Sequence, residues 1–266
     1  MTFTGKTIVV TGAASGIGRA LLGQLSRYVC TIVAADIDEK ALDTAVAELI
    51  HTPAQISAVV ADLATPEGTT AVLDAAAERK PIDLVFANAG FGRYGTLDTT
   101  GSWDDLEAMF RLNVLAPIWT AKLLRERYPD HPYRLVITAS VMSLVGLPGY
   151  AAYGATKGAL HRFADAYRYE LGDRAALTLV YPVATETPFF ERADGAPLPW
   201  PHQTAEEVAR ATLRGVEQGR ATISPSRLFS VYRRAGPLRP LIARIIQQRE
   251  KWRLNAWLRA RGEPPV

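Results

Sequence analysis

The chain has 266 residues, of which 48% are apolar and 21% charged, a composition typical of a globular protein and one that excludes wholesale disorder. Its single cysteine, Cys30, excludes an intramolecular disulfide, and the four histidines are scattered without metal-ligand spacing, so we expect no bound metal. The net charge of +3 is unevenly spread: positions 220–263 carry eleven Arg or Lys and two Glu, whereas the rest of the chain carries nineteen basic and twenty-five acidic residues.

The sequence indicates a cytoplasmic protein. No apolar run approaches the roughly 20 residues of a membrane span. The first predicted strand begins by position 7, which leaves no room for a usual signal peptide. Cys30 lies at the start of an apolar strand and is expected to be a buried, inert thiol, as suits a reducing compartment.

Strand-like and helical segments alternate along the chain, which predicts an α/β fold with a parallel sheet between two layers of helices. The predicted strands are 7–11, 31–35, 56–60, 84–87, 135–139, 177–181 and 221–224. The predicted helices are 16–28, 38–50, 65–78, 102–127, one that contains position 153 and ends near residue 172, and 204–218. We expect residues 1–225 to form a doubly wound seven-stranded sheet in the order 3-2-1-4-5-6-7, with residues 183–203 as a loop.

Glycines cluster between the first strand and the first helix, in the run Thr11-Gly12-Ala-Ala-Ser15-Gly16-Ile17-Gly18. Glycines there permit a tight turn and a close approach of the backbone to a diphosphate, and the helix N-terminus offers free N–H groups. Asp36 ends the second strand, where its carboxylate can accept hydrogen bonds from both ribose hydroxyls and would repel a 2′-phosphate. The sequence therefore predicts NAD in preference to NADP. Asp62, next to Leu63, could hold the adenine amine or simply cap a loop.

A second constellation is Tyr153 and Lys157, with Ser140 thirteen positions upstream of the tyrosine. Residues four apart on a helix share one face, so Lys157 lies one turn from Tyr153. A nearby cation favours phenolate and lowers the tyrosine pKa, as a general base for an alcohol requires. Ser140 follows the strand 135–139, where its hydroxyl could bind the same substrate oxygen.

Together these motifs resemble those of the short-chain dehydrogenase/reductase family, in its single-domain form, over roughly residues 5–225. The matching positions are the Thr11–Gly18 turn, Asp62-Leu63, Asn88-Ala89-Gly90, Asn113, Ser140, Tyr153, Lys157 and the segment from Pro182 to Thr187. In the family the tyrosine is the acid/base, the serine positions the substrate oxygen, and the lysine also binds the nicotinamide ribose. The nicotinamide itself carries the hydride.

The resemblance also implies further roles. Asn113 would hold a water through its backbone carbonyl; here Pro117, four residues on, has no N–H to occupy that carbonyl. Asn88, Ala89 and Gly90 would pack beneath the cofactor. Pro182, Val183, Thr185 and Thr187 would form the nicotinamide segment, with Thr187 on the carboxamide. Val183 departs from the usual glycine, and its Cβ is expected to narrow the approach to the nicotinamide.

The loops after the fourth, fifth and sixth strands should line the substrate site, because doubly wound sheets bind ligands at their carboxyl edge. These loops carry mainly apolar and aromatic residues, namely Phe91, Arg93, Tyr94, Val141, Met142, Leu147, Tyr150, Phe189, Phe190 and Trp200. Such a lining favours a bulky hydrophobic alcohol or ketone. We expect Ser140, Met142, Tyr150, Tyr153 and Phe189 to contact it.

Residues 226–266 form a basic extension that is not expected to be an independent domain. From Leu238, apolar residues recur at spacings of three and four, which predicts one or two amphipathic helices with an arginine-rich opposite side. Three roles remain open: packing on the domain or closing the substrate site, a dimer contact, or peripheral attachment to an anionic membrane. No reading motif accompanies the charge, so nucleic-acid binding is not expected.

The sequence thus predicts an NAD-dependent oxidoreductase that interconverts a secondary alcohol and a ketone. Two alternatives stay open, an NADP-dependent carbonyl reductase and a non-catalytic NAD(P)-sensing or scaffold protein. By analogy with the family, we expect a homodimer or homotetramer paired through the helices near 102–127 and 153–172.

Overall fold

The structure is a computed structural model that describes residues 2–78, 80–99, 101–171, 177–199 and 201–266. Two sequence predictions lie outside the described residues. One is the end of a helix near residue 172, and the other is Trp200 as a lining residue of the substrate site.

Seven strands form the central sheet. They are β1 (Thr7–Thr11), β2 (Thr31–Asp36), β3 (Gln55–Val60), β4 (Leu84–Ala87), β5 (Arg134–Thr138), β6 (Leu177–Val180) and β9 (Thr222–Ile223). All neighbours pair in parallel, in the order β3-β2-β1-β4-β5-β6-β9, which confirms the predicted order. The order reverses between β1 and β4, the point where a doubly wound sheet binds its ligand.

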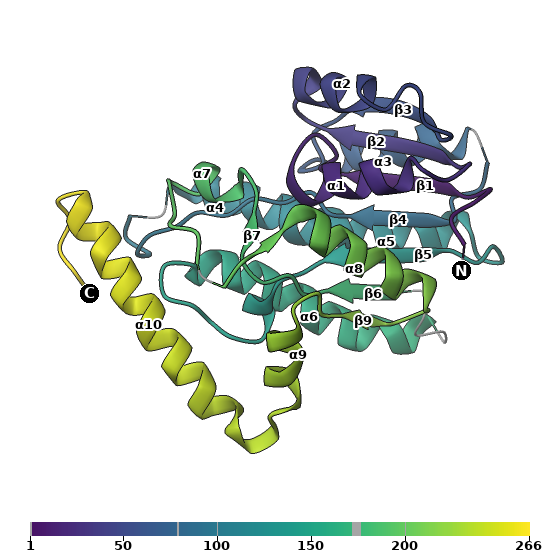
Figure 1. Ribbon diagram of the computed structural model, residues 1–266. Coiled ribbons are helices and arrows are strands. Elements are labelled where there is room, and N and C mark those ends of the chain that lie inside the picture. The colour runs from purple at the N-terminus through teal and green to yellow at the C-terminus, as the bar shows by residue number, and fades with distance from the viewer. Residues whose placement is uncertain (1, 79, 100, 172–176, 200) are drawn as a thin grey trace.

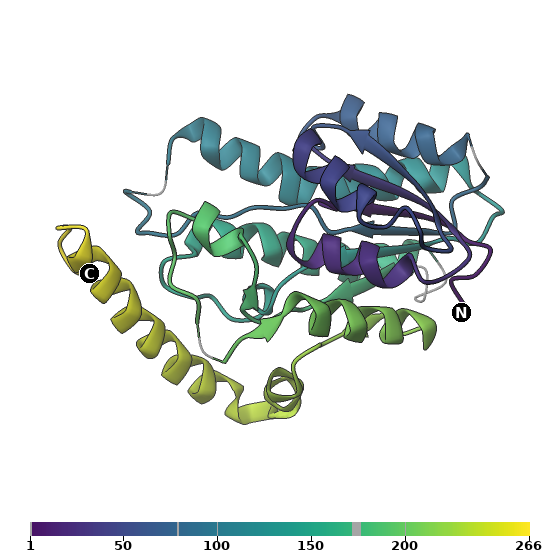
Figure 2. The ribbon, with the colours of Figure 1, turned by 45° about the horizontal axis from the view of Figure 1, so that its top comes forward.

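Helices cover both faces of the sheet (Figures 1 and 2). One layer holds α1 (Gly16–Leu25), α2 (Glu39–Ala47) and α8 (Ala205–Glu217); the other holds α3 (Pro66–Ala77), α5 (Ala116–Arg127) and α6 (Ala151–Leu171). Successive strand residues point to opposite faces, so in β1 Ile8 and Val10 join the first layer and Val9 joins the second. Both faces are apolar, as a buried parallel sheet requires.

The predicted single helix over 102–127 is wrong in its middle. The structure has α4 (Trp103–Phe110), then the π-helical turn η1 (Arg111–Leu115), then α5. Pro117 has no N–H to donate to the carbonyl of Asn113, and the Ala116 N–H bonds the carbonyl of Arg111, five residues back. The start is as predicted, because Ser102 and Asp105 form a capping box.

The predicted loop over 183–203 contains regular structure. Strands β7 (Thr185–Glu186) and β8 (Gln203–Thr204) pair in parallel, and α7 (Phe189–Arg192) lies between them. Two-residue strands and a single helical turn carry no periodic signal, so the sequence could not indicate them.

The C-terminal arm, residues 227–260, comprises α9 (Arg227–Arg234), the 3₁₀ turn η4 (Gly236–Leu238) and α10 (Arg239–Ala260). Phe229 and Tyr232 of α9 are buried against the layer that contains α6. The chain then bends at η4, and α10 runs back along the outside of the molecule (Figure 1). In the part of the chain that the structure describes, no helix has both the length and the apolar character needed to cross a membrane.

Candidate active site

The turn between β1 and α1 requires its glycines. Gly12 and Gly16 have φ angles of 65° and 54°, in the left-handed region that favours glycine. A Cβ on Gly18 would lie 1.9 Å from the carbonyl oxygen of Gly12, so only glycine lets α1 start this close to the turn. Ser15, the N-cap of α1, makes no side-chain capping bond, and the first N–H groups of the helix receive no acceptor from it. These features fit a bound diphosphate.

Asp36 lies beside this turn. Its Oδ2 accepts a hydrogen bond from the N–H of Ala14 at 3.0 Å, and its Oδ1 accepts from the N–H groups of Ile37 and Asp38 at 2.8 and 3.2 Å. A carboxylate offers about four acceptor positions, so roughly one remains for a ribose hydroxyl. The bonds that fix the turn thus occupy most of the acceptor positions of Asp36 and leave capacity for a ribose hydroxyl.

Arg19, the basic residue beside the glycine turn in the sequence, is engaged elsewhere. Arg19 pairs with Glu48 at 2.5 Å on the outer side of α1 and α2. Ile37, the residue after Asp36, is apolar and 66% exposed. The described partners of the Asp36 carboxylate are thus backbone N–H groups, and Arg19 is engaged by Glu48 instead.

Three other predicted cofactor residues have structural partners. Leu63 and Ile17 pack their side chains against the hydrophobic core on opposite faces of the sheet. Asp62 is exposed, and its Oδ1 accepts from the N–H of Ala64 at 2.9 Å, which is the loop-capping alternative.

Asn88, Ala89 and Gly90 follow β4, where a polar network ties three strand ends together. The Thr11 Oγ1 accepts from the N–H groups of Asn88 and Ala89, both at 3.0 Å. Asn88 donates through Nδ2 to the carbonyl of Thr11 at 3.2 Å and accepts through Oδ1 from Thr138 at 3.1 Å. The carboxyl edge of β1, β4 and β5 is thereby held rigidly beneath the expected cofactor.

Asn113 is 1% exposed and uses its side chain fully. Its Oδ1 accepts from the N–H of Phe91 at 3.1 Å, and its Nδ2 donates to the carbonyl of Phe91 at 2.8 Å and to the Thr156 Oγ1 at 3.1 Å. A Cβ on Gly90 would lie 2.8 Å from the Asn113 Oδ1. The side chain thus fixes the loop after β4 against α6, next to Lys157.

Ser140, Tyr153 and Lys157 come together as predicted from their spacing. Ser140 is the N-cap of the 3₁₀ turn η2 (Val141–Ser143), and its Oγ accepts from the Met142 N–H at 3.1 Å. Burial raises the pKa of the Tyr153 hydroxyl well above its ordinary value, and the hydrogen bond with Ser140 opposes that rise. Lys157 lies with its Nζ 5.6 Å from the centre of the Tyr153 ring and donates to the carbonyl of Thr138 at 2.9 Å. Burial lowers the pKa of Lys157 to about 8.

The segment after β6 closes the site on the other side. The carbonyl of Pro182 accepts from the Val141 N–H at 3.1 Å, and Thr185 donates through Oγ1 to the carbonyl of Val183 at 2.9 Å. Val183 packs partly against the core, so its side chain is accommodated there. Thr187 reaches the glycine turn: a Cβ on Gly16 would lie 3.0 Å from its Cγ2. Pro182, Thr185 and Thr187 therefore line one path from Ser140 to the turn.

An aromatic cluster extends from Tyr153 away from the glycine turn. The Tyr153 ring centre is 5.2 Å from that of Phe189 and 6.1 Å from that of Tyr150. Tyr150 in turn lies 4.7 Å from Tyr94, and Tyr94 lies 5.1 Å from Trp257 of α10. We define the aromatic cluster as Tyr94, Met142, Tyr150, Tyr153, Phe189, Phe190, Leu254, Trp257 and Leu258, all of which pack together.

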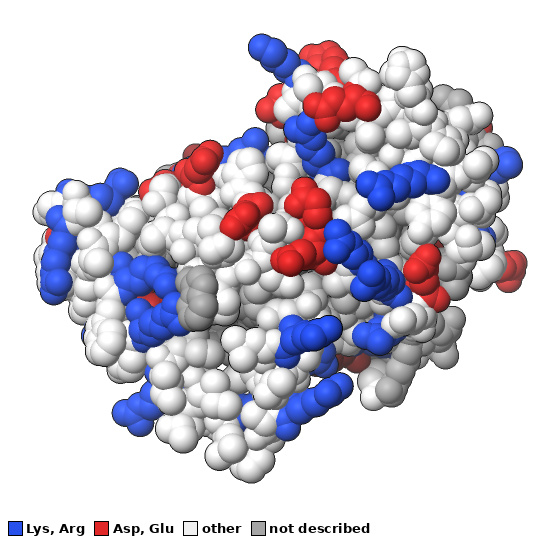
Figure 3. Space-filling view, viewed as in Figure 1, with Lys and Arg blue, Asp and Glu red and all other residues white. Residues whose placement is uncertain are grey.

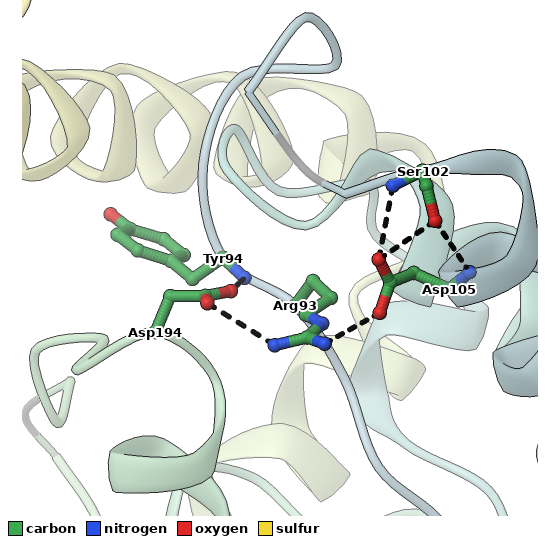
Figure 4. Close-up of polar contacts among 5 residues, drawn as sticks. All are labelled: Arg93, Tyr94, Ser102, Asp105 and Asp194. Atoms are coloured by element: carbon green, nitrogen blue, oxygen red, sulfur yellow. Dashed lines mark hydrogen bonds and ion pairs between the residues drawn. The ribbon is translucent and has the colours of Figure 1, made fainter.

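Ion pairs of Arg93, which we call the Arg93 clasp, join the loop after β4 to α4 and to the loop after α7. Figure 4 shows the Arg93 guanidinium lying between the carboxylates of Asp105 and Asp194, at 2.6 and 3.3 Å. Asp194 also accepts from the Tyr94 N–H at 3.4 Å. Among the described non-glycine residues, only Asp194 has a positive φ, 57°. The capping bonds of Ser102 and the ion pair with Arg93 hold the pKa of the Asp105 carboxyl below its usual range.

The comparisons with known proteins agree with this geometry. A family model described as short chain dehydrogenase matches residues 6–196. The chain belongs to this family. It is 35% identical to a 1-deoxy-11-beta-hydroxypentalenate dehydrogenase of Streptomyces exfoliatus over 191 residues, 70% of each chain. It is 28% identical to a cyclopentanol dehydrogenase of Comamonas sp. over 229 residues, 85% of this chain and 89% of the relative.

Two solved short-chain dehydrogenases have the same fold. The enzyme from Sphingobium yanoikuyae in complex with NADPH is 26% identical, with a TM-score of 0.76 over 84% of this chain and 88% of that one. The enzyme from Burkholderia phymatum in complex with NAD is 24% identical, with a TM-score of 0.76 over 100% of this chain and 98% of that one. The present chain is thus a short-chain dehydrogenase/reductase that acts on alcohols or ketones with a nicotinamide cofactor.

Sequence reasoning left several residues of this short-chain dehydrogenase out of the site. Gly92 lies between two rings, since a Cβ there would be 2.8 Å from the Phe189 Cζ and 2.9 Å from the Tyr153 Cδ2. Thr138 and Thr156 bind Lys157 and Asn113. Leu254 and Leu258 of α10 were recognised as apolar but not placed beside Tyr153.

Proposed function

We propose that this protein oxidises a bulky hydrophobic secondary alcohol to a ketone with NAD. The observation that carries the proposal is the position of the Ser140 and Tyr153 hydroxyls. They meet between the glycine turn, which suits a dinucleotide, and the aromatic cluster, which suits an apolar substrate.

In this mechanism Ser140 and Tyr153 bind the alcohol oxygen, and the Tyr153 phenolate removes its proton. The raised pKa of Tyr153 makes the phenolate costly, so a neighbouring cation is needed. Lys157, with its pKa lowered to about 8, still carries its proton on most molecules at neutral pH. Its ammonium group therefore stabilises the phenolate, while its bond to Thr138 fixes its direction.

The residues present fit a nicotinamide dinucleotide. Lys157 would bind the nicotinamide ribose, Thr187 the carboxamide, and the turn from Gly12 to Gly18 the diphosphate. When bound, the nicotinamide accepts a hydride from the carbinol carbon. Asn113 would hold a water through its backbone carbonyl and so link Lys157 to solvent, while its side chain keeps the loop after β4 aligned with α6.

Asp36 supports NAD as the cofactor. Its carboxylate accepts a hydrogen bond from the turn at Ala14, and Arg19 of the adjacent helix is paired with Glu48 instead. One related solved structure holds NADPH and another holds NAD, so family membership alone does not select the cofactor. The proposal for NAD therefore depends on the residues around Asp36. The NAD pool of cells usually favours oxidation, which makes dehydrogenation the proposed direction.

The aromatic cluster supports a bulky apolar substrate, since Tyr150 and Phe189 pack directly on the Tyr153 ring, with ring centres 6.1 and 5.2 Å away. The names of two relatives describe a hydroxypentalenate and cyclopentanol. Cyclopentanol is a cyclic secondary alcohol, in agreement with the chemistry proposed for this site.

We also propose that the protein pairs with a second copy through α4, η1 and α6. Large apolar side chains stand exposed there, with Trp103 at 78%, Leu115 at 57% and Tyr169 at 74%. Light scattering of the chromatographed protein tests this, and a monomer at micromolar concentration would contradict it.

The function is tested by following NADH production across secondary alcohols graded from short aliphatic to sterol and aryl carbinols, each with NAD and with NADP. We expect NAD-dependent activity whose kcat/KM rises with substrate bulk. Activity with NADP alone would favour the carbonyl reductase alternative. Tight NAD binding without turnover of any alcohol would favour a sensor.

A further inference from the structure

The outer side of the C-terminal arm exposes six large apolar side chains. Each is between 59% and 73% exposed, and they are Leu228, Val231, Leu238, Leu241, Ile245 and Trp252. Leu241, Ile245 and Trp252 are four and seven residues apart, on one face of α10, and Leu238 precedes that helix as its N-cap. Leu228 and Val231 are three apart on α9. We call these six residues the outer apolar face.

The opposite side of α10 packs on the body of the protein. Leu254 and Leu258 are 2% and 1% exposed in the aromatic cluster, and Gln247 donates to the carbonyl of Gly146 at 3.0 Å. Trp257 donates to the carbonyl of Gly195 at 3.3 Å. Folding of the domain therefore accounts for the inner side of α10 and leaves the outer apolar face in contact with water.

The charge around this face has one sign. Between residues 227 and 262 the sequence contains one acidic residue, Glu250, which is 7% exposed and pairs with Arg253 at 2.9 Å. The exposed charged side chains of this stretch are all basic, namely Arg227, Arg233, Arg234, Arg244, Arg249, Lys251, Arg259 and Arg261. Figure 3 shows basic side chains separated by uncharged surface over α9 and α10.

We propose that the outer apolar face docks on the surface of an anionic lipid bilayer. Large apolar side chains flanked by arginine and lysine, without exposed acid, match the boundary between acyl chains and anionic headgroups. A second copy meeting the same face would bring two basic surfaces together, which repel each other. The apolar side chains also distinguish this face from a nucleic-acid site, where basic and polar groups contact phosphate.

Docking would have a consequence for catalysis, and this part rests on the proposed function. The inner side of α10 covers the aromatic cluster beside Tyr153, so the docked arm would lie between the bilayer and the substrate site. An apolar alcohol dissolved in the bilayer would then reach Tyr153 along α10. The substrate class is thus a secondary alcohol that partitions into lipid.

Co-sedimentation of the full-length protein with vesicles tests the docking without any need for turnover. We compare vesicles of equal parts phosphatidylglycerol and phosphatidylcholine with vesicles of phosphatidylcholine alone, at low and high salt. We expect partition onto the anionic vesicles to exceed that onto the neutral ones by about tenfold and to weaken with salt.

The double variant Leu241→Asp/Ile245→Asp should reduce that partition by about tenfold or more. The matched control is Ile50→Asp, since Ile50 is 76% exposed on the opposite end of the molecule, before β3, and lies outside the arm. Thermal melts establish that both variants fold. Equal partition of wild type and the double variant overturns the proposal. A second result would also overturn the proposal: wild type does not bind vesicles but forms a concentration-dependent dimer, and the double variant does not form that dimer.

Kinetics then test the substrate route. With a short water-soluble alcohol, the double variant and wild type should have the same kcat and KM. With a sterol carbinol carried in anionic vesicles, the double variant should show a raised apparent KM and an unchanged kcat. Absence of both activities in wild type would count against the proposed function alone, because vesicle binding is measured independently.

Discussion

The two sides of Tyr153 are built from different materials. The dinucleotide side consists of backbone groups and short polar side chains, with Thr11, Asn88 and Thr138 bonded across three strand ends. The substrate side consists of rings and aliphatic side chains from four segments far apart in sequence, closed by α10. The ion pairs that hold this side together are those of Arg93 with Asp105 and Asp194, whose side chains are about a third exposed.

This difference separates what the fold holds rigidly from what it can vary. Backbone geometry at a strand end tolerates few substitutions, as the 1.9 Å approach at Gly18 shows. Ring packing tolerates exchanges of similar volume. We therefore expect changes on the dinucleotide side to alter cofactor use and changes on the substrate side to alter substrate use. Tyr153 belongs to both sides, so its replacement should have the largest effect.

Tyr153→Phe should lower kcat by about a thousandfold, because it removes the proton acceptor and keeps the ring in its cluster. The KD for NAD, measured by fluorescence titration, should change by less than about threefold. Ser140→Ala serves as the companion variant and should lose less activity, since it removes one hydrogen bond to the substrate oxygen. Substantial turnover by Tyr153→Phe would exclude this residue as the base.

Lys157→Met should abolish turnover while making the protein without cofactor more stable at pH 7, by about 2 kcal/mol. Burial lowers the pKa of Lys157 to about 8 in the folded state, whereas the unfolded value is near 10.4. Between the folded and the unfolded pKa of Lys157, the unfolded chain binds more protons than the folded one, so the free energy of unfolding of wild type rises with pH. Below the folded pKa, the buried charge destabilises the folded state by its full amount.

Urea melts of wild type and Lys157→Met at pH 7 and at pH 9.5 check this expectation. The gain in the variant should be largest at pH 7 and should shrink at pH 9.5, as wild-type Lys157 loses its proton. The lost bond to the Thr138 carbonyl offsets part of the gain. A gap that is equal at both pH values would show that the buried charge is not its cause.

The difference between the dinucleotide side and the substrate side of Tyr153 also explains which site residues the sequence could predict. The glycine turn, Asp36, Ser140 and the Tyr153–Lys157 pair were found because strand ends and one helical turn convert sequence spacing into distance. The parallel sheet followed from the alternation of elements, and its strand order is that of a doubly wound fold. The break at η1 was not found, although Pro117 indicated its cause, because propensity alone does not place a π turn. Leu254 and Gly92 were missed as site residues because their neighbours, Tyr94 and Phe189, come from distant segments.

Asp36→Ala sharpens the comparison on the dinucleotide side alone. Removing the carboxylate should raise kcat/KM with NADP by about tenfold and lower it with NAD by a similar factor. The loss of the bond to the Ala14 N–H loosens the turn and accounts for part of the decrease with NAD. Asp36→Asn is the matched control, since it keeps hydrogen-bonding capacity without the negative charge. Wild type that already prefers NADP would refute the assignment.

Asp194→Asn probes the substrate side with the smallest expected effect. Asparagine tolerates the positive φ of this position, so the variant removes the charge facing Arg93 without adding backbone strain. Because the pair is partly exposed, the loss of stability should stay within about 1 kcal/mol.

The α7 segment should nevertheless become less well fixed beside Tyr153, since Asp194 lies two residues after the end of α7 and also accepts from the Tyr94 N–H. We expect KM for a bulky alcohol to rise about threefold, with kcat and the KM for NAD unchanged.

Asp194→Ala should lower stability and raise this KM more than Asp194→Asn does, because alanine does not tolerate the left-handed backbone. A change in KM for NAD in Asp194→Asn would mean that the two sides of Tyr153 are mechanically joined through α7 and β7, since Thr187 on the same segment touches the glycine turn. Steady-state kinetics with each substrate varied in turn therefore decide whether the two sides act as separate units.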